Sequence, residues 1–119
     1  MVLLGGGLGS LARYTAGRAI MSRFGSRFPL GTMVINVTGS FAIGLLMTTF
    51  TERFHPHPNW RLLLVVGFLG GYTTFSSFEY ESYSLIRGGG NWLAVVNLLG
   101  SVACGLFAVW LGSILAGRH

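Results

Sequence analysis

The chain has 119 residues, of which 51% are hydrophobic and only 9% charged, and its net charge is +5. A soluble domain usually has about 25% charged residues, so this composition excludes an ordinary water-soluble fold, and a disordered chain would be more polar still. The arginines are scattered along the sequence rather than gathered on one basic face, which argues against a nucleic acid as partner. We therefore expect an integral membrane protein with a single transmembrane domain over residues 1–119.

Four stretches are long and apolar enough to cross a bilayer, which takes about 20 mostly apolar residues in a helix. The connections between them contain charged residues, prolines or consecutive glycines, as the breaks between helices should. The sequence thus predicts an all-α integral membrane fold with four transmembrane helices, at about residues 2–21, 30–50, 60–86 and 92–116.

The first span contains a G-x-G-x-x-A pattern that begins at Gly7 and loosely matches a dinucleotide-binding motif. The true motif needs a preceding strand and an acidic residue about 20 positions later, and this sequence has no carboxylate there. Small residues at this spacing are typical of helices that approach closely in lipid. Arg13 lies well inside the same span, where it is expected to reach an interface or to pair with a carboxylate or with carbonyls of a neighbouring helix.

Asn36 is a polar amide in the middle of the second span, and Thr32 and Ser40 lie four residues to either side of it. At this spacing the three side chains share one face of a helix. Polar groups at membrane depth are costly unless they meet partners or water. This face is therefore predicted either to make hydrogen bonds between helices or to line an ion path.

The third span contains the adjacent glycines Gly70 and Gly71, followed by a run of hydroxyl residues. This composition is poor for an uninterrupted helix, and it predicts a third helix that is broken near its middle. Irregular backbone is tolerated in a bilayer only where it is buried in protein or lines a cavity. The carbonyls exposed at such a break suit a cation, whereas the start of the following helix favours an anion.

Phe75 and Phe78 are three residues apart and project from one face just after the predicted break. The edge of a phenyl ring is partially positive, so a pair of rings can accommodate a small anion without holding it tightly, as conduction requires. Hydroxyls that can donate to the same ion are predicted at Thr74, Ser77 and, in the fourth span, Ser101.

The arginines are almost evenly divided between the two ends of the predicted spans, which gives little preference for one orientation under the positive-inside rule. A chain of this kind can insert either way up, and two copies can pair antiparallel in the manner of an inverted repeat. We therefore expect a dimer. The arginines counted are Arg53, Arg61 and Arg118 at the end with both termini, and Arg18, Arg23, Arg27 and Arg87 at the other.

Three blocks of the sequence, at residues 5–14, 31–41 and 67–78, resemble the small bacterial fluoride channels of the CrcB, or Fluc, family. The first block is similar to the pattern G-G-x-x-G-x-x-x-R-Y, the second to G-T-x-x-x-N-x-x-G-x-F and the third to G-F-x-G-G-x-T-T-F-S-[TS]-F. The third block is highly specific, and with the order of the blocks and the four-span layout the resemblance covers nearly the whole chain.

The resemblance implies an antiparallel, dual-topology homodimer with two pores for the passive export of fluoride across the bacterial cytoplasmic membrane, and no enzyme activity. It also implies a central structural Na⁺ ion at the dimer interface, held by the backbone carbonyls of Gly70 and Thr73. The residues that it places on the fluoride path are Asn36, Phe75, Phe78, Glu81 and Ser101, beside the hydroxyls of Thr74 and Ser77.

Two other functions fit parts of the sequence. A small four-helix drug/proton antiporter would need a carboxylate in the first span, where the sequence has Arg13 and no Asp or Glu. A membrane scaffold that conducts nothing would explain the small residues, but not the hydroxyl run with its two phenylalanines.

Overall fold

The computed structural model describes residues 1–25 and 27–117, and the regular elements of this part are all helices joined by short connections. Arg118, which entered the count of arginines, lies outside the described residues. The helices are α1 (Val2–Phe24), α2 (Leu30–Thr48) continued by the π-helical η1 (Thr49–Arg53), α3 (Pro58–Arg61) continued by the π-helical η2 (Leu62–Leu69) and α4 (Gly70–Tyr72), then α5 (Phe75–Arg87) and α6 (Asn91–Gly117).

Within the described residues, three stretches are helical, long and apolar enough to cross a membrane: Leu30–Arg53, Pro58–Arg87 and Asn91–Gly117. These are the second, third and fourth of the predicted spans. Helix α1 has 23 residues and is long enough for a hydrocarbon core of about 30 Å. Its arginines lower its hydropathy, however, and it is not among the three, so a fourth span stays a prediction.

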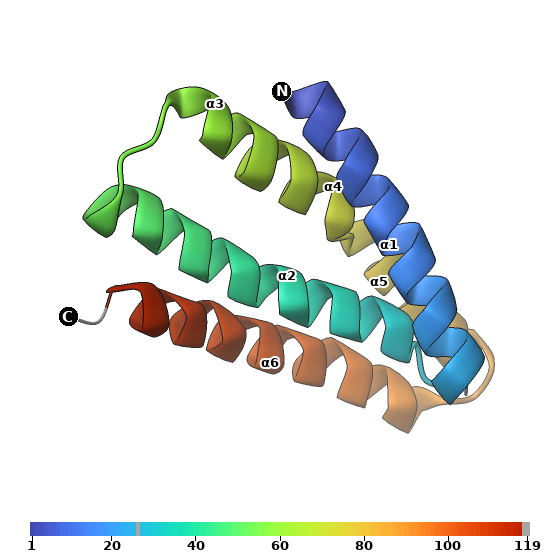
Figure 1. Cartoon of the computed structure of the whole chain (residues 1–119). Helices are drawn as coiled ribbons and strands as arrows, with labels where there is room; N and C mark the ends of the chain where they lie inside the picture. The colour runs from blue at the N-terminus through green and yellow to red at the C-terminus, as the bar shows by residue number, and fades with distance from the viewer. Residues whose placement is uncertain (26, 118–119) are drawn as a thin grey trace.

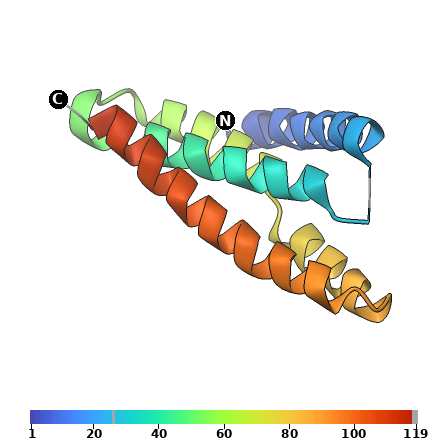
Figure 2. The ribbon, with the colours of Figure 1, turned by 90° about the horizontal axis from the view of Figure 1, so that it is seen from below.

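The third span changes its neighbours at the break between α4 and α5. Before the break, η2 and α4 pack along α1, and after it α5 packs against α6. Helices α2 and α6 lie side by side over most of their length (Figure 1). Figure 2 shows the connection from α4 to α5 passing from the level of α1 and α2 towards α6. The break therefore lies where the third span leaves α1 and begins to pack against α6.

The helices touch backbone to backbone at glycines. A Cβ atom on Gly9 would collide with the backbone of Phe68, and one on Gly71 would collide with the backbone of Gly6. Helices α2 and α6 approach each other in the same way at Gly112. The small residues of the first span thus serve close helix packing, as one of the two interpretations of the pattern predicted, and the pattern lies inside a helix rather than between a strand and a helix.

Many large apolar side chains of this chain are exposed, whereas two polar side chains, Ser82 and Asn97, are buried among the apolar ones. Asn97 is only 1% exposed, whereas Leu99 and Leu106 on the same helix are 68% and 70% exposed. Apolar side chains that face outwards around polar side chains that face inwards suit a lipid environment, where a buried polar group needs a partner and an outer leucine does not.

Candidate functional site

The break in the third span is made by two extended residues. Thr73 has φ −84° and ψ 158°, and Thr74 has φ −149° and ψ 122°. The hydroxyl of Thr73 donates to the carbonyl of Leu69 at 2.9 Å, and the hydroxyl of Thr74 accepts the N–H of Ser77 at 3.3 Å. Thr74 thus caps the start of α5, because its hydroxyl oxygen accepts an N–H that has no backbone partner there. The Thr73 hydroxyl adds a second hydrogen bond to the Leu69 carbonyl, which also accepts the N–H of Thr73 at 3.0 Å. The predicted discontinuity is confirmed.

Asn36 on α2 pairs with both backbone groups of Thr74. Its Nδ2 donates to the Thr74 carbonyl at 2.9 Å, and its Oδ1 accepts the Thr74 N–H at 2.8 Å. The side-chain amide therefore takes the place of a neighbouring strand for one residue of extended backbone. Of the two hypotheses for Asn36, hydrogen bonding between helices is confirmed. The pair uses one of the two protons of the amide, so the second stays available to another acceptor.

Arg13 reaches from α1 to the end of α4. Its Nε donates to the carbonyl of Gly71 at 3.1 Å. In a continuous helix this carbonyl would accept the N–H of Phe75, but the break removes that partner. A cation is also favoured at the C-terminal end of a helix by the helix dipole. The charge inside the first span is thus explained, and it binds a carbonyl of a neighbouring helix, one of the alternatives expected for it.

The break also frees the two carbonyls predicted to hold a cation. In a continuous helix the carbonyl of Gly70 would accept the N–H of Thr74, and that of Thr73 would accept the N–H of Ser77. The N–H of Thr74 bonds Asn36 instead, and that of Ser77 bonds the Thr74 hydroxyl. Hard backbone oxygens released in this way have the donor chemistry that suits a small cation.

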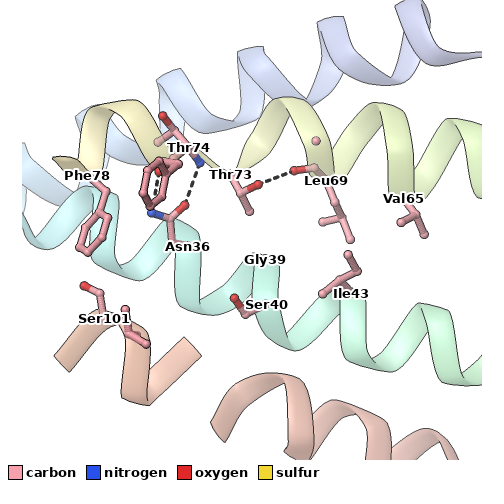
Figure 3. Close-up of a pocket in the computed structure, with 13 residues that line it drawn as sticks. Asn36, Gly39, Ser40, Ile43, Val65, Leu69, Thr73, Thr74, Phe78 and Ser101 are labelled. Carbon is pink, nitrogen blue, oxygen red and sulfur yellow. Dashed lines mark hydrogen bonds between the residues drawn. The ribbon is translucent and has the colours of Figure 1, made fainter. Parts of the chain in front are cut away.

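An open cavity of about 410 Å³ lies beside the break, between α2, the third span and α6 (Figure 3). Its wall combines an amide, hydroxyls, backbone and aromatic rings from three separate stretches of the sequence. The predicted site residues that line it are Asn36, Gly70, Thr73, Thr74, Phe75, Phe78 and Ser101.

The two phenylalanines of the cavity differ in exposure. Their ring centroids are 6.0 Å apart with an angle of 56° between the planes. Phe78 is only 7% exposed, whereas Phe75 is 71% exposed. The inner ring is therefore held within one chain, while the outer ring stands at the open side of the cavity.

Helix α6 is joined to α5 by a chain of hydrogen bonds that is buried at Asn97 and Ser82. Ser101 donates to Oδ1 of Asn97 at 3.2 Å, Nδ2 of Asn97 donates to Ser82 at 2.8 Å, and Ser82 donates to the carbonyl of Phe78 at 2.9 Å. Asn97 and Ser101 are four residues apart and share one face of α6, but only Ser101 lines the cavity. Sequence reasoning did not single out Ser82, for which the only signal was its position four residues after Phe78 on the same helix face.

Glu81 and Ser77 do not line this cavity in the single chain. Glu81 lines a second cavity of about 530 Å³ near the end of α5, together with Thr32 and Arg27. Oε1 of Glu81 is buried and has no hydrogen-bond partner in the part of the chain that the structure describes. Glu79 is exposed and lines neither cavity. Glu81 thus lies beyond Phe78 along α5, on the way from the break to the end of the helix.

An all-helical chain with a broken membrane helix, freed carbonyls and a polar cavity at the break has the features of a membrane channel or transporter. The model of one family, described as CrcB-like protein, Camphor Resistance (CrcB), matches residues 1–113. The chain belongs to this family. The resemblance of the three sequence blocks is thereby confirmed.

Curated relatives match the chain over nearly its whole length. A protein of Solibacter usitatus is 65% identical over 118 residues, which are 99% of this chain and 97% of the relative. A protein of Acidobacterium capsulatum is 50% identical over 98% of this chain and 94% of its own length. One of Pyrococcus horikoshii is 40% identical over 99% of this chain and 94% of its own. Each of the three is named a fluoride-specific ion channel FluC.

Proposed function

We propose that this chain forms a fluoride-selective channel, not an enzyme, and that it exports fluoride passively across the bacterial cytoplasmic membrane. The observation that carries the proposal is the cavity at the helix break, where Asn36, Phe75, Phe78 and Ser101 meet. The family and the names of its relatives support the same function. Passive export protects a cell from fluoride that enters as the neutral acid.

The chemistry of the wall suits a small, strongly hydrated anion. Such an ion must exchange its water shell for other donors. The hydroxyl of Thr74 accepts the N–H of Ser77, so its own proton is free to donate, and Asn36 keeps one amide proton. The edges of the Phe75 and Phe78 rings add weak positive potential. In our proposal an ion passes these groups and continues towards Ser77 and Glu81.

Two copies are needed to close this path, and we propose that they form an antiparallel, dual-topology homodimer with two pores. The exposure of Phe75 supports this, because one chain leaves the outer side of the cavity open. The small bias in arginine positions supports insertion in both orientations. Helix α1 packs along η2 and α4 through glycines, so it shares their depth and serves as the fourth span.

The central Na⁺ ion is part of the same proposal. The carbonyls of Gly70 and Thr73, freed at the break, would hold it at the interface of the two copies. A fixed positive charge there lowers the barrier to an anion in the neighbouring pores. Arg13, bound to the adjacent carbonyl of Gly71, adds a second positive charge from within each chain.

Fluoride efflux from liposomes tests the channel. Vesicles loaded with potassium fluoride and carrying the purified protein receive a potassium ionophore, and a fluoride electrode follows the release. We expect fast fluoride release, no chloride release from matched chloride vesicles, and no release from vesicles without protein. Equal release of both ions would contradict selectivity, and no release by folded, dimeric protein would favour the scaffold. Fluoride release that ceases without a proton gradient would favour a coupled antiporter.

A further inference from the structure

A third cavity lies away from the helix break, at the connection between η1 and α3. It has a volume of about 430 Å³ and an amphipathic wall of one arginine, two histidines, two prolines and two large apolar side chains. None of these residues takes part in the proposed fluoride path. They are Phe50, His55, Pro56, His57, Pro58, Arg61 and Leu62.

His57 and Arg61 supply the donor groups of this cavity that are free to bind a ligand. Nδ1 of His57 accepts the N–H of Asn59 at 3.1 Å, so the proton of the neutral ring is on Nε2 and can be donated. Nδ1 of His55 lies 3.0 Å from the carbonyl of Phe50, which can only accept, so His55 donates there and has no further N–H for a ligand in the neutral ring. No group of three or more His, Cys, Asp or Glu occurs in the described residues. The free donors of His57 and Arg61 are groups that suit an anion.

Arg61 supplies the charge. It lies four residues after His57, so both side chains are on one face at the start of the third span. Within residues 1–25 and 27–117 its guanidinium has no hydrogen-bond or ion-pair partner. Arg53, near the same end of the molecule, donates to the carbonyl of Ala116 at 3.0 Å and so holds the end of α6. Glu52 lies beside Gly117 and does not line the cavity.

The surroundings place the cavity at the surface of the membrane. Phe54 is 60% exposed and Trp60 is 52% exposed, and both lie beside the cavity in the sequence. Exposed aromatic side chains next to arginine at the ends of apolar helices are typical of the lipid headgroup region. Phe50 and Leu62 extend the wall of the cavity into the apolar spans.

We propose that this cavity binds the phosphodiester headgroup of an anionic phospholipid. The guanidinium of Arg61 donates to phosphate oxygens in its forked geometry, and Nε2 of His57 donates a further hydrogen bond. Phe50 and Leu62 contact the beginning of the acyl chains. The site is separate from the helix break and does not depend on the proposed fluoride conduction.

The test is a lipid titration of the purified protein in mild detergent, with thermal unfolding followed by intrinsic fluorescence. The probes are phosphatidylglycerol, phosphatidylcholine and inorganic phosphate. Of these three probes, we expect only phosphatidylglycerol to raise the unfolding temperature, and its effect should saturate as its concentration increases. Arg61→Gln should weaken the apparent affinity for phosphatidylglycerol about fivefold, as expected for one arginine at an anionic membrane surface. Arg61→Lys should weaken this affinity less, because lysine keeps the positive charge and loses only the bidentate hydrogen-bonding geometry of the guanidinium.

Arg23→Gln is the matched control, because Arg23 is an exposed arginine at the opposite end of the described helices. It should leave the titration unchanged. Equal effects of Arg61→Gln and Arg23→Gln would overturn the proposal, since the lipid would then be sensing overall charge. Stabilisation by inorganic phosphate equal to that by phosphatidylglycerol would also overturn it in favour of a free-anion site. Fluoride efflux from vesicles of phosphatidylcholine alone measures conduction separately, so failure of the lipid site and failure of the channel are distinguishable.

Discussion

The pairing of Asn36 with Thr74 gives the sharpest prediction about the break. Asn36→Ala removes both partners of the extended Thr74 backbone, the acceptor at 2.8 Å and the donor at 2.9 Å. Hydrogen bonds between membrane helices contribute about 0.6–1.7 kcal/mol each. A backbone group left without a partner in a buried site costs about 1–3 kcal/mol. Since Thr74 is half-buried beside a cavity, we expect a total of about 2–4 kcal/mol against the broken conformation.

We take conduction to require this conformation, and the broken and unbroken conformations to be close in free energy in the wild type, so that the rate falls in proportion to the population of the broken one. At about 1.4 kcal/mol for each factor of ten, the predicted loss of fluoride efflux is about 30- to 1,000-fold. The assay is the initial rate of ionophore-driven efflux from liposomes at low protein density. Thr51→Val is the matched control, because it removes an exposed hydroxyl that bonds only carbonyls of its own helix and does not line the cavity. It should stay within about twofold of the wild type.

Asn36→Asp separates the structural role of the amide from a role in the ion path. Aspartate keeps an acceptor for the Thr74 N–H, but it removes the donor and places a negative charge beside the anion path. Efflux by Asn36→Ala within threefold of the wild type, in dimeric and folded protein, would refute the role of the pairing in conduction. If Asn36→Asp is blocked in that case, position 36 lies beside the ion path but its amide is not required, because only the added negative charge impedes the anion.

Three further perturbations test other parts of the site. Phe75→Ile or Phe78→Ile should lower fluoride efflux at least about tenfold, because the ring edges are lost. Size-exclusion chromatography should show an unchanged dimer, because the side-chain volume is nearly kept. Unchanged efflux in both variants would remove the rings from the mechanism. Arg13→Gln should reduce efflux about tenfold, since the Gly71 carbonyl loses its charged donor. Full efflux together with an unaltered unfolding temperature would contradict this expectation. Gly112→Val should destabilise the detergent-solubilised protein by about 1–3 kcal/mol, because its side chain meets the backbone of α2, and a wild-type unfolding temperature would show that the two helices can separate without cost.

Much of this protein follows from its sequence through local rules. The scarcity of charge and the apolar periods predicted membrane helices, and the structure places three of them within a few residues of the expected ends. The glycine pair and the hydroxyl run predicted the break, because glycine weakens a helix and a threonine side chain can cap the start of the next one. These properties belong to short segments, so no knowledge of the tertiary fold was needed.

What the individual side chains do at the break depended on partners that are distant in the sequence. Asn36 pairs with a residue 38 positions away, and Arg13 with one 58 positions away, and no pattern within either helix identifies these partners. The structure likewise separates Ser101, on the cavity wall, from Asn97, buried between α5 and α6, although both lie on one stripe of the same helix. A helical period tells which residues share a face, but only the packing of the other helices decides what that face meets.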